Sequence, residues 1–223
     1  MNSEVIVRRI LKPALFLAAF APCAWLLWAA GMGALSADPL AELTHETGIW
    51  TLRFLCATLA VTPLRRLTGW NAVIRFRRML GLYAFFYGTL HLLIYVIADR
   101  FAGLDLASDL RVWTAARGLG AAIGADVFKR PFITMGFTAW ACMAPLAATS
   151  TVRMIRYLGG RRWRLLHRLI YVAAITGVVH YWWSVKADIR RPEIYAVLLG
   201  SLLVNRLWPI RSGKARASAR LAA

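Results

Sequence analysis

The sequence predicts an all-α integral membrane protein, a bundle of six transmembrane helices with both termini in the cytoplasm. Of its 223 residues, 60% are hydrophobic and only 17% are charged, whereas a soluble domain has roughly 45–50% apolar and about 25% charged residues. The apolar residues gather in blocks of about 20, the length of a helix that crosses a bilayer. This composition excludes a disordered chain, a disulfide-rich secreted domain and an ordinary cytosolic enzyme.

Six apolar segments, bounded by charged residues or by Pro and Gly, are the predicted spans. They are residues 13–35, 48–63, 79–98, 131–149, 165–185 and 192–208. The domain organisation that follows is a cytoplasmic N-terminus (1–12), a six-helix transmembrane domain (13–208) and a basic cytoplasmic tail (209–223).

Each span has its own boundary signal. The first follows a short basic segment, as a signal peptide does, but its apolar run exceeds the roughly 7–15 residues of a signal sequence, so we expect a retained helix. The second ends at Pro63, just before two arginines, and the third begins directly after Arg78. The fourth and sixth begin at Pro131 and Pro192, and the fifth follows a run of arginines.

The charges predict the orientation of these spans. With the N-terminus in the cytoplasm, nineteen of the 28 Lys and Arg residues but only one of the ten acids fall on the cytoplasmic side. This is the positive-inside pattern, and it accounts for the net charge of +18 without a nucleic-acid partner. The basic segments are expected to contact lipid headgroups. Arg77 and Arg78 among them could also hold a phosphate, such as that of a flavin, or dock an acidic electron donor.

Histidines within the spans indicate a cofactor. An ionisable side chain inside a bilayer is costly and suggests a functional site, and imidazole is a common axial ligand of haem iron. His91 lies 12 residues after Met79, and His180 lies 12 residues after Arg168. Both therefore lie about 18 Å from the inner end of their helices. We predict a haem held between His91 and His180; the alternative is a pair of core histidines hydrogen-bonded across helices. His45 is expected to be a surface residue of the first outer loop.

A glycine lies one turn before each of these two histidines, Gly88 before His91 and Gly177 before His180. Because glycine has no Cβ, it lets a flat macrocycle approach the backbone closely. We therefore include both glycines in the predicted cofactor site.

Two further residues have two interpretations each. His167 lies 13 residues before His180, which is about 19.5 Å along one continuous helix, so the two cannot bind one iron. His167 is either a ligand of a second, inner cofactor or a residue at the level of the lipid headgroups. Arg53 either pairs with a haem propionate or extends to the membrane surface.

Several longer stretches match a known family in order. They are residues 33–39 (GALSADP), 77–82 (RRMLGL), 129–134 (KRPFIT), 146–151 (LAATST), 158–168 (LGGRRWRLLHR) and 180–188 (HYWWSVKAD). Through them the chain, from about residue 22 to residue 208, resembles the MsrQ family. These are haem-binding membrane subunits of periplasmic methionine sulfoxide reductase systems, within the wider ferric-reductase-like transmembrane group.

The resemblance implies haem b, with His91, His167 and His180 as the ligands, and FMN. It also implies a multi-pass protein of the bacterial inner membrane. Electrons would come from the quinone pool or a cytosolic flavin reductase and pass to MsrP, a molybdopterin enzyme that repairs oxidised methionines in the periplasm. The wider group has two histidines on each of two helices. Because Arg77 and Arg78 occupy the place of the inner histidine on the third span, either one haem or two are expected.

Only 15 residues follow the last predicted span, too few for a flavin and nicotinamide domain. We therefore expect an electron-transfer subunit that relays electrons between two other molecules, rather than a catalytic subunit. The alternatives are a stand-alone ferric or oxygen reductase, which would need an open coordination position on its haem, and a haem carrier.

Overall fold

The computed structural model describes residues 3–101, 123–185 and 188–207. Within these residues the regular elements are helices, and there is no strand, as the predicted all-α class requires. They are α1 (Ser3–Ile6), a π-helical segment (Val7–Leu11), α2 (Lys12–Gly31), α3 (Pro39–Thr68), a 3-10 helix (Asn71–Phe76), α4 (Arg77–Phe101), helical residues 123–129, α6 (Pro131–Ala148), α7 (Val152–Leu166), α8 (Leu169–Ser184) and α9 (Arg190–Leu207). The predicted basic tail lies outside the described residues, as does most of the long loop before α6.

Four helical segments of the described part are long and apolar enough to cross a membrane. They are Val7–Gly31, Pro39–Thr68, Asn71–Ile97 and Pro131–Ala148. Leu169–Ser184 is apolar but shorter. Helices thus occupy all six predicted segments, while membrane crossing by α8 and α9 and the cytoplasmic location of the termini stay predictions.

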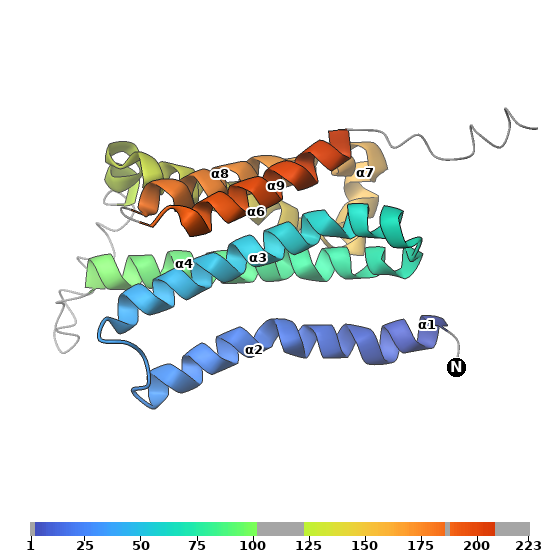
Figure 1. The fold of residues 1–223 in the computed structure, drawn as a ribbon. Coiled ribbons are helices and arrows are strands. Elements are labelled where there is room, and N and C mark those ends of the chain that lie inside the picture. Colours follow the sequence, from blue (N-terminus) through green and yellow to red (C-terminus); the bar gives the residue numbers. More distant parts are fainter. Residues whose placement is uncertain (1–2, 102–122, 186–187, 208–223) are drawn as a thin grey trace, which may run out of the picture.

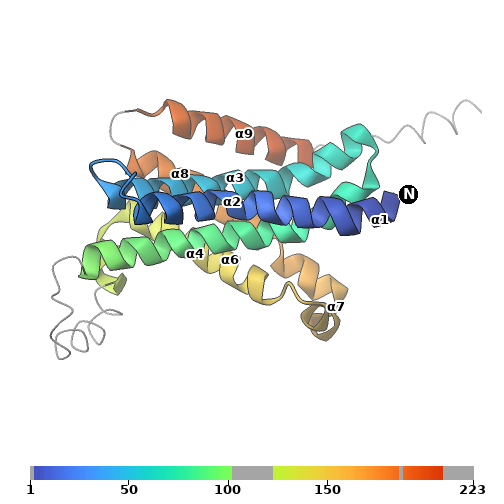
Figure 2. The same cartoon turned by 90° about the horizontal axis from the view of Figure 1, so that it is seen from below.

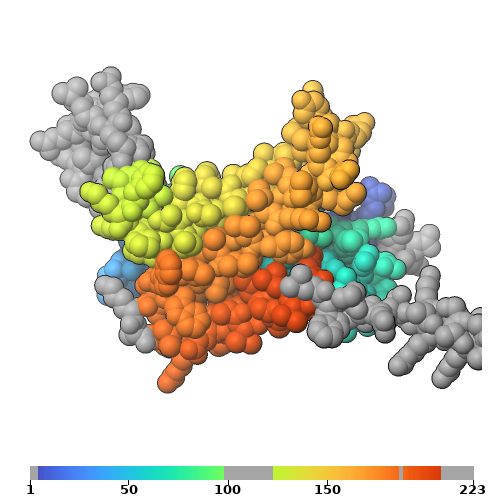
Figure 3. Space-filling view, turned by 90° about the horizontal axis from the view of Figure 1, so that it is seen from above, coloured from blue at the N-terminus to red at the C-terminus, as the bar shows by residue number. Residues whose placement is uncertain are grey.

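The long helices form two closely packed pairs. α3 packs mainly against α4, and α6 packs mainly against α8. Figure 1 shows α2 on one side of the α3–α4 pair, with α6, α8 and α9 on the other. Viewed from below (Figure 2), α7 leaves the line of the bundle at the end that also holds the N-terminus. The space-filling view shows α7 standing out from the surface (Figure 3).

Two tyrosines of α4 attach α2 to the bundle. The Tyr83 hydroxyl donates to the Phe16 carbonyl at 2.9 Å. The Tyr87 hydroxyl donates to the Ala19 carbonyl at 2.9 Å and accepts from the Cys23 N–H at 3.1 Å. Ala19 and Cys23 are four residues apart, so this hydroxyl replaces the backbone hydrogen bond that would otherwise join the Cys23 N–H to the Ala19 carbonyl. Pro22 lies inside α2 at this point, and a proline interrupts the backbone hydrogen bonds of a helix because it lacks an N–H.

The expectation of an outer loop around His45 was wrong, because α3 already begins at Pro39. The Asp38 carboxylate accepts a hydrogen bond from the Ala41 N–H at 3.0 Å and caps the helix, and Pro39 fits the first helical turn without losing a hydrogen bond. His45 therefore lies on a helix, although its side chain is exposed as expected.

The expectation that His167 belongs to the fifth span was also wrong. The arginine-rich stretch before it forms a separate helix, α7, which begins after the Thr151 cap and ends at Leu166. His167 is the C-cap of α7, and α8 begins two residues later, at Leu169. Because the helix is interrupted here, the rotation and rise calculated along one continuous helix do not apply between His167 and His180.

Candidate functional site

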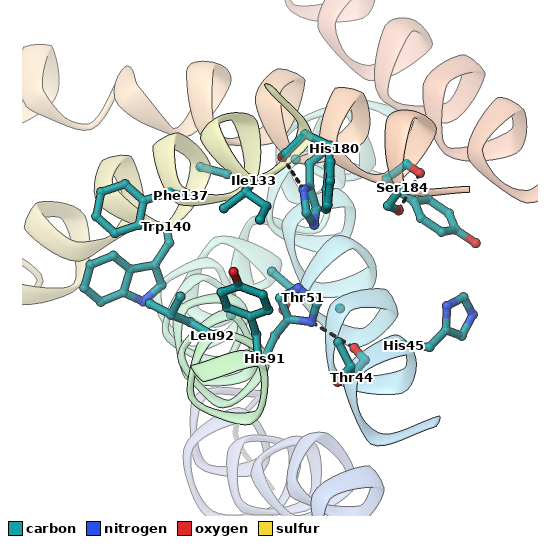
Figure 4. Close-up of a pocket in the computed structure, with 18 of the residues that line it drawn as sticks. Thr44, His45, Thr51, His91, Leu92, Ile133, Phe137, Trp140, His180 and Ser184 are labelled. Atoms are coloured by element: carbon teal, nitrogen blue, oxygen red, sulfur yellow. Dashed lines mark hydrogen bonds between the residues drawn. The ribbon is translucent and has the colours of Figure 1, made fainter. Parts of the chain in front are cut away.

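A cavity lies between the α3–α4 pair and the α6–α8 pair (Figure 4). Its volume is about 530 Å³, within the roughly 300–1,000 Å³ of typical ligand and cofactor sites. All four helices contribute to its wall, and its polar lining includes Thr44, His45, His91, Tyr95 and His180. The two helix pairs therefore enclose a space large enough for a cofactor.

His91 and His180 face one another across this cavity. His91 comes from α4 and His180 from α8, and Figure 4 shows the two rings pointing toward each other from opposite walls. Their centroids are 5.9 Å apart, and their planes make an angle of 79°. The structure thus brings together the two histidines that the sequence placed at equal depth.

Each imidazole is held by a backbone carbonyl of the neighbouring helix. His91 Nδ1 is 2.8 Å from the Thr44 carbonyl oxygen on α3. His180 Nδ1 is 2.6 Å from the Phe132 carbonyl oxygen on α6. A carbonyl oxygen can only accept, so each Nδ1 must carry the proton and donate it. In the neutral ring the Nε2 atom then keeps a free lone pair, which is the form that binds a metal.

The protein supplies too few ligands for a bare metal ion at this place. Among the described residues, no group of three or more His, Cys, Asp or Glu side chains could hold a metal ion. His91 and His180 could hold a metal between them only if the group that carries the metal supplied the remaining donors itself. The pair therefore fits a metal that brings its own equatorial donors in a planar macrocycle.

The family can be established by comparison with known proteins. A family model described as the ferric reductase like transmembrane component matches residues 47–178. A protein of Ralstonia nicotianae, named protein-methionine-sulfoxide reductase heme-binding subunit MsrQ, is 49% identical over 207 residues, covering 92% of this chain and 88% of the relative. This chain belongs to the MsrQ family.

Relatives with the same name occur in other bacteria. The MsrQ of Xanthomonas oryzae pv. oryzae is 47% identical over 227 aligned residues, covering 98% of this chain and 95% of the relative. That of Xanthomonas campestris pv. campestris is 46% identical over 220 residues, covering 97% and 93%. No solved structure matches the chain.

In the described part of this MsrQ-family chain, four glycines line the cavity between the histidines. A Cβ at Gly88 would lie 3.0 Å from the Met143 Cε atom, and one at Gly177 would lie 3.4 Å from a methyl group of Leu52. The sequence singled out these two and missed Gly48 and Gly136, each of which lies against a histidine ring.

Little in the sequence could have identified the site groups that the analysis missed. The carbonyls of Thr44 and Phe132 belong to the backbone, which every residue has. The positions of Gly48 and Gly136 become informative only once it is known that α3 packs beside α4 and α6 beside α8. His45, placed in a loop by the sequence, lines the cavity with its ring 6.0 Å from that of Tyr181.

His167 lies apart from this cavity. Its Nε2 atom is 3.4 Å from the Thr149 hydroxyl, and its ring packs on Trp163 with the centroids 3.9 Å apart. The Trp163 indole donates to the Thr149 carbonyl at 3.0 Å. Burial, and to a smaller extent the positive charge of Arg77, lowers the pKa of His167 below its usual value. The structure thus places His167 in a small cluster at the junction of α6, α7 and α8.

The three arginines of the predicted site lie outside the cavity. Arg53 stacks over Trp50 at 4.4 Å and lines a second hollow, of about 430 Å³, together with Glu46 and Tyr195. Arg77 and Arg78 begin α4 at the other end of the bundle. Of the two, Arg78 is exposed, and Arg77 is half-buried.

Another arginine, Arg206, lies in the last turn of α9, which ends at the same end of the bundle as the start of α4 (Figure 1). It bonds the Tyr171 hydroxyl and, at 2.7 Å, the Thr62 hydroxyl, and so joins α9 to α8 and α3. The end of the bundle that holds the arginine-rich elements is therefore strongly basic.

Proposed function

We propose that this chain is a haem b-binding electron-transfer subunit of the bacterial inner membrane, and that it supplies electrons to a periplasmic methionine sulfoxide reductase. The observation that carries the proposal is the pair of facing imidazoles, 5.9 Å apart, whose Nδ1 atoms are both bonded to carbonyls. The name of the relatives, heme-binding subunit, supports the same cofactor for this chain.

The spacing of the rings suits one iron between them. A metal–imidazole bond is about 2 Å long, so two imidazoles on opposite sides of one metal have centroids about 6 Å apart. Haem iron bound by both His91 and His180 would have no open position for a substrate. A relay role therefore fits better than a ferric or oxygen reductase that binds its substrate at the iron.

The direction of transfer follows from the proposed topology. We take the basic end, with Arg77, Arg78 and α7, as cytoplasmic, and propose six spans with both termini on that side. A donor there, either the quinone pool or a flavin reductase, would reduce the relay, and the exposed arginines are the groups that could receive the phosphate of FMN. His91 and His180 lie toward the opposite end, where an acceptor such as MsrP would dock.

The test is the haem content per chain and the reduced-minus-oxidised spectrum of the purified protein and its variants. We expect wild type to show low-spin haem b. His91→Ala and His180→Ala should each lose it, because either change removes one axial ligand. His45→Ala is the matched control, since His45 lines the same cavity but does not face the other two rings. Full haem retention in His91→Ala would contradict the proposed site.

The acceptor is tested separately. Reduced protein in proteoliposomes should be fully reoxidised by a catalytic amount of purified MsrP together with a methionine sulfoxide substrate, and not when either is omitted. Reoxidation by ferric chelates or oxygen at the same rate without MsrP would instead favour the stand-alone reductase.

A further inference from the structure

The two histidine anchors repeat one arrangement. On α3, the carbonyl of Thr44 holds the His91 ring, and Gly48 follows four residues later. On α6, the carbonyl of Phe132 holds the His180 ring, and Gly136 follows four residues later. Residues four apart lie on the same face of a helix. Each supporting helix therefore offers its histidine a carbonyl and, one turn further on, a stretch of backbone without a side chain.

The glycines are required here for space and not for backbone shape. Among the described residues, the glycines with positive φ are Gly33, Gly69 and Gly159, so Gly48 and Gly136 do not need the freedom of glycine to form their helices. A Cβ at Gly136 would lie 2.8 Å from His180 Nδ1 and 2.9 Å from its Cε1. A Cβ at Gly48 would lie 3.1 Å from His91 Nδ1 and 3.2 Å from its Cε1.

These contacts involve the atom that makes the anchoring hydrogen bond. A Cβ at either position would approach Nδ1 itself, so the ring could move away only by lengthening its bond to the carbonyl or by rotating. The 2.8 Å approach at Gly136 is too short for any real contact and demands a shift, whereas 3.1 Å at Gly48 demands a few tenths of an ångström. The effect should therefore be graded between the two positions.

We propose that Gly48 and Gly136 are positioning residues that set the orientation and the electron donation of the two haem ligands. An Nδ1–H bond to a carbonyl makes the imidazole a stronger donor to the metal, which stabilises ferric over ferrous iron. Displacing the ring weakens that bond and raises the reduction potential. This inference rests on the haem site proposed above and adds that two residues without side chains tune it.

The test compares Gly136→Ala and Gly48→Ala in the purified, haem-loaded protein. The first readout is the EPR spectrum of the ferric form. Imidazole planes near perpendicular, as the 79° angle requires, give a single strongly anisotropic low-spin signal, and coplanar rings give a rhombic one. The second readout is the midpoint potential from a redox titration. We expect Gly136→Ala to shift the EPR signal and raise the potential, and Gly48→Ala to do both to a smaller extent.

Two glycines serve as controls. A Cβ at Gly81, on the same helix as His91, would meet Thr58 at 3.7 Å, an ordinary contact, and one at Gly200 would have nothing within 4 Å. Gly81→Ala and Gly200→Ala should keep the wild-type EPR signal and potential. If Gly136→Ala fails to accumulate, Gly48→Ala decides the question, because its smaller clash can be absorbed by the ring.

The outcomes separate this inference from the proposed function. Wild-type EPR signals and potentials in both glycine variants would overturn the positioning role while leaving the two-histidine site intact. Haem whose spectrum does not change in His91→Ala and His180→Ala would overturn the proposed site itself.

Discussion

At the scale of single residues, the protonation of the two facing histidines is set by their surroundings. Each Nδ1 atom meets a carbonyl oxygen, and each Nε2 atom is left to the cavity. Because the carbonyls belong to helices, which are rigid, the orientation of each ring depends little on side-chain rotamers elsewhere. The positions of the two rings are therefore set by backbone groups of the protein itself.

Equal depth in the sequence led us to expect that His91 and His180 lie close together, and their rings are 5.9 Å apart. Their role as ligands stays a prediction. The estimate of depth worked because it needed only the rise of two uninterrupted helices. The anchors at Thr44 and Phe132 could not be predicted, because they depend on which helices pack side by side.

A prediction at this scale concerns His167, which does not line the cavity. We expect His167→Ala to keep the haem stoichiometry and the low-spin spectrum of wild type, because the change removes only the contacts with Thr149 and Trp163. Optical and EPR spectra of the purified variant check this. Loss of part of the haem would instead establish a second, inner site.

Tyr87 supports another prediction. Its side chain is fully buried and makes two hydrogen bonds to α2, whereas Tyr83 makes one. Tyr87→Phe should lower the free energy of unfolding by roughly 1–2 kcal/mol, and Tyr83→Phe by less than about 1 kcal/mol. Thermal unfolding in detergent measures both. Equal losses of unfolding free energy in the two variants would mean that the second hydrogen bond of Tyr87, from the Cys23 N–H, contributes little to stability.

At the scale of elements, hydropathy located the apolar part of each long helix but not its polar extensions. α3 begins at Pro39, nine residues before the predicted span, because a cap and a proline start a helix without any apolar run. α7 was read as a basic loop and the start of a span, since its sequence is rich in arginine and has no apolar stretch. In both places the missed residues are polar and helical, and a search for apolar membrane spans does not detect such helices.

Within α7, Gly159 has φ 72° and ψ 150°, a conformation that is essentially limited to glycine. Gly159→Ala should therefore strain this helix by about 1–3 kcal/mol and speed trypsin cleavage at its arginines. Gly160→Ala is the control, because the nearest atom to its Cβ is the flexible end of Arg164. Similar cleavage rates in the two variants would show that the backbone at position 159 accommodates a Cβ without strain.

At the scale of the whole molecule, charge divides between the two ends of the bundle. Figure 1 shows the N-terminus, the turn between α3 and α4, α7 and the C-terminal end of α9 at the same end. The opposite end carries acids and bases together: Asp38 precedes α3, Asp126, Lys129 and Arg130 precede α6, and Arg190, Arg191 and Glu193 begin α9. This division is the one expected for a protein whose basic end stays in the cytoplasm.

The orientation can be tested by labelling with a membrane-impermeant maleimide in intact cells whose outer membrane has been permeabilised. In a background without Cys23, Cys56 and Cys142, we expect Asp188→Cys to be labelled and Arg162→Cys to be protected until the inner membrane is broken. Both positions are exposed, so accessibility alone cannot explain a difference. The reverse pattern would invert the proposed topology.

The pairing of the helices has a consequence for how the molecule comes together. α3 and α4 contain one histidine with its carbonyl and its glycine, and α6 and α8 contain the other complete set. Each helix pair thus contains the groups that orient its own histidine, and the cavity lies between the two pairs. In the proposed haem site, each helix pair would therefore supply one ligand that is already oriented by its own backbone.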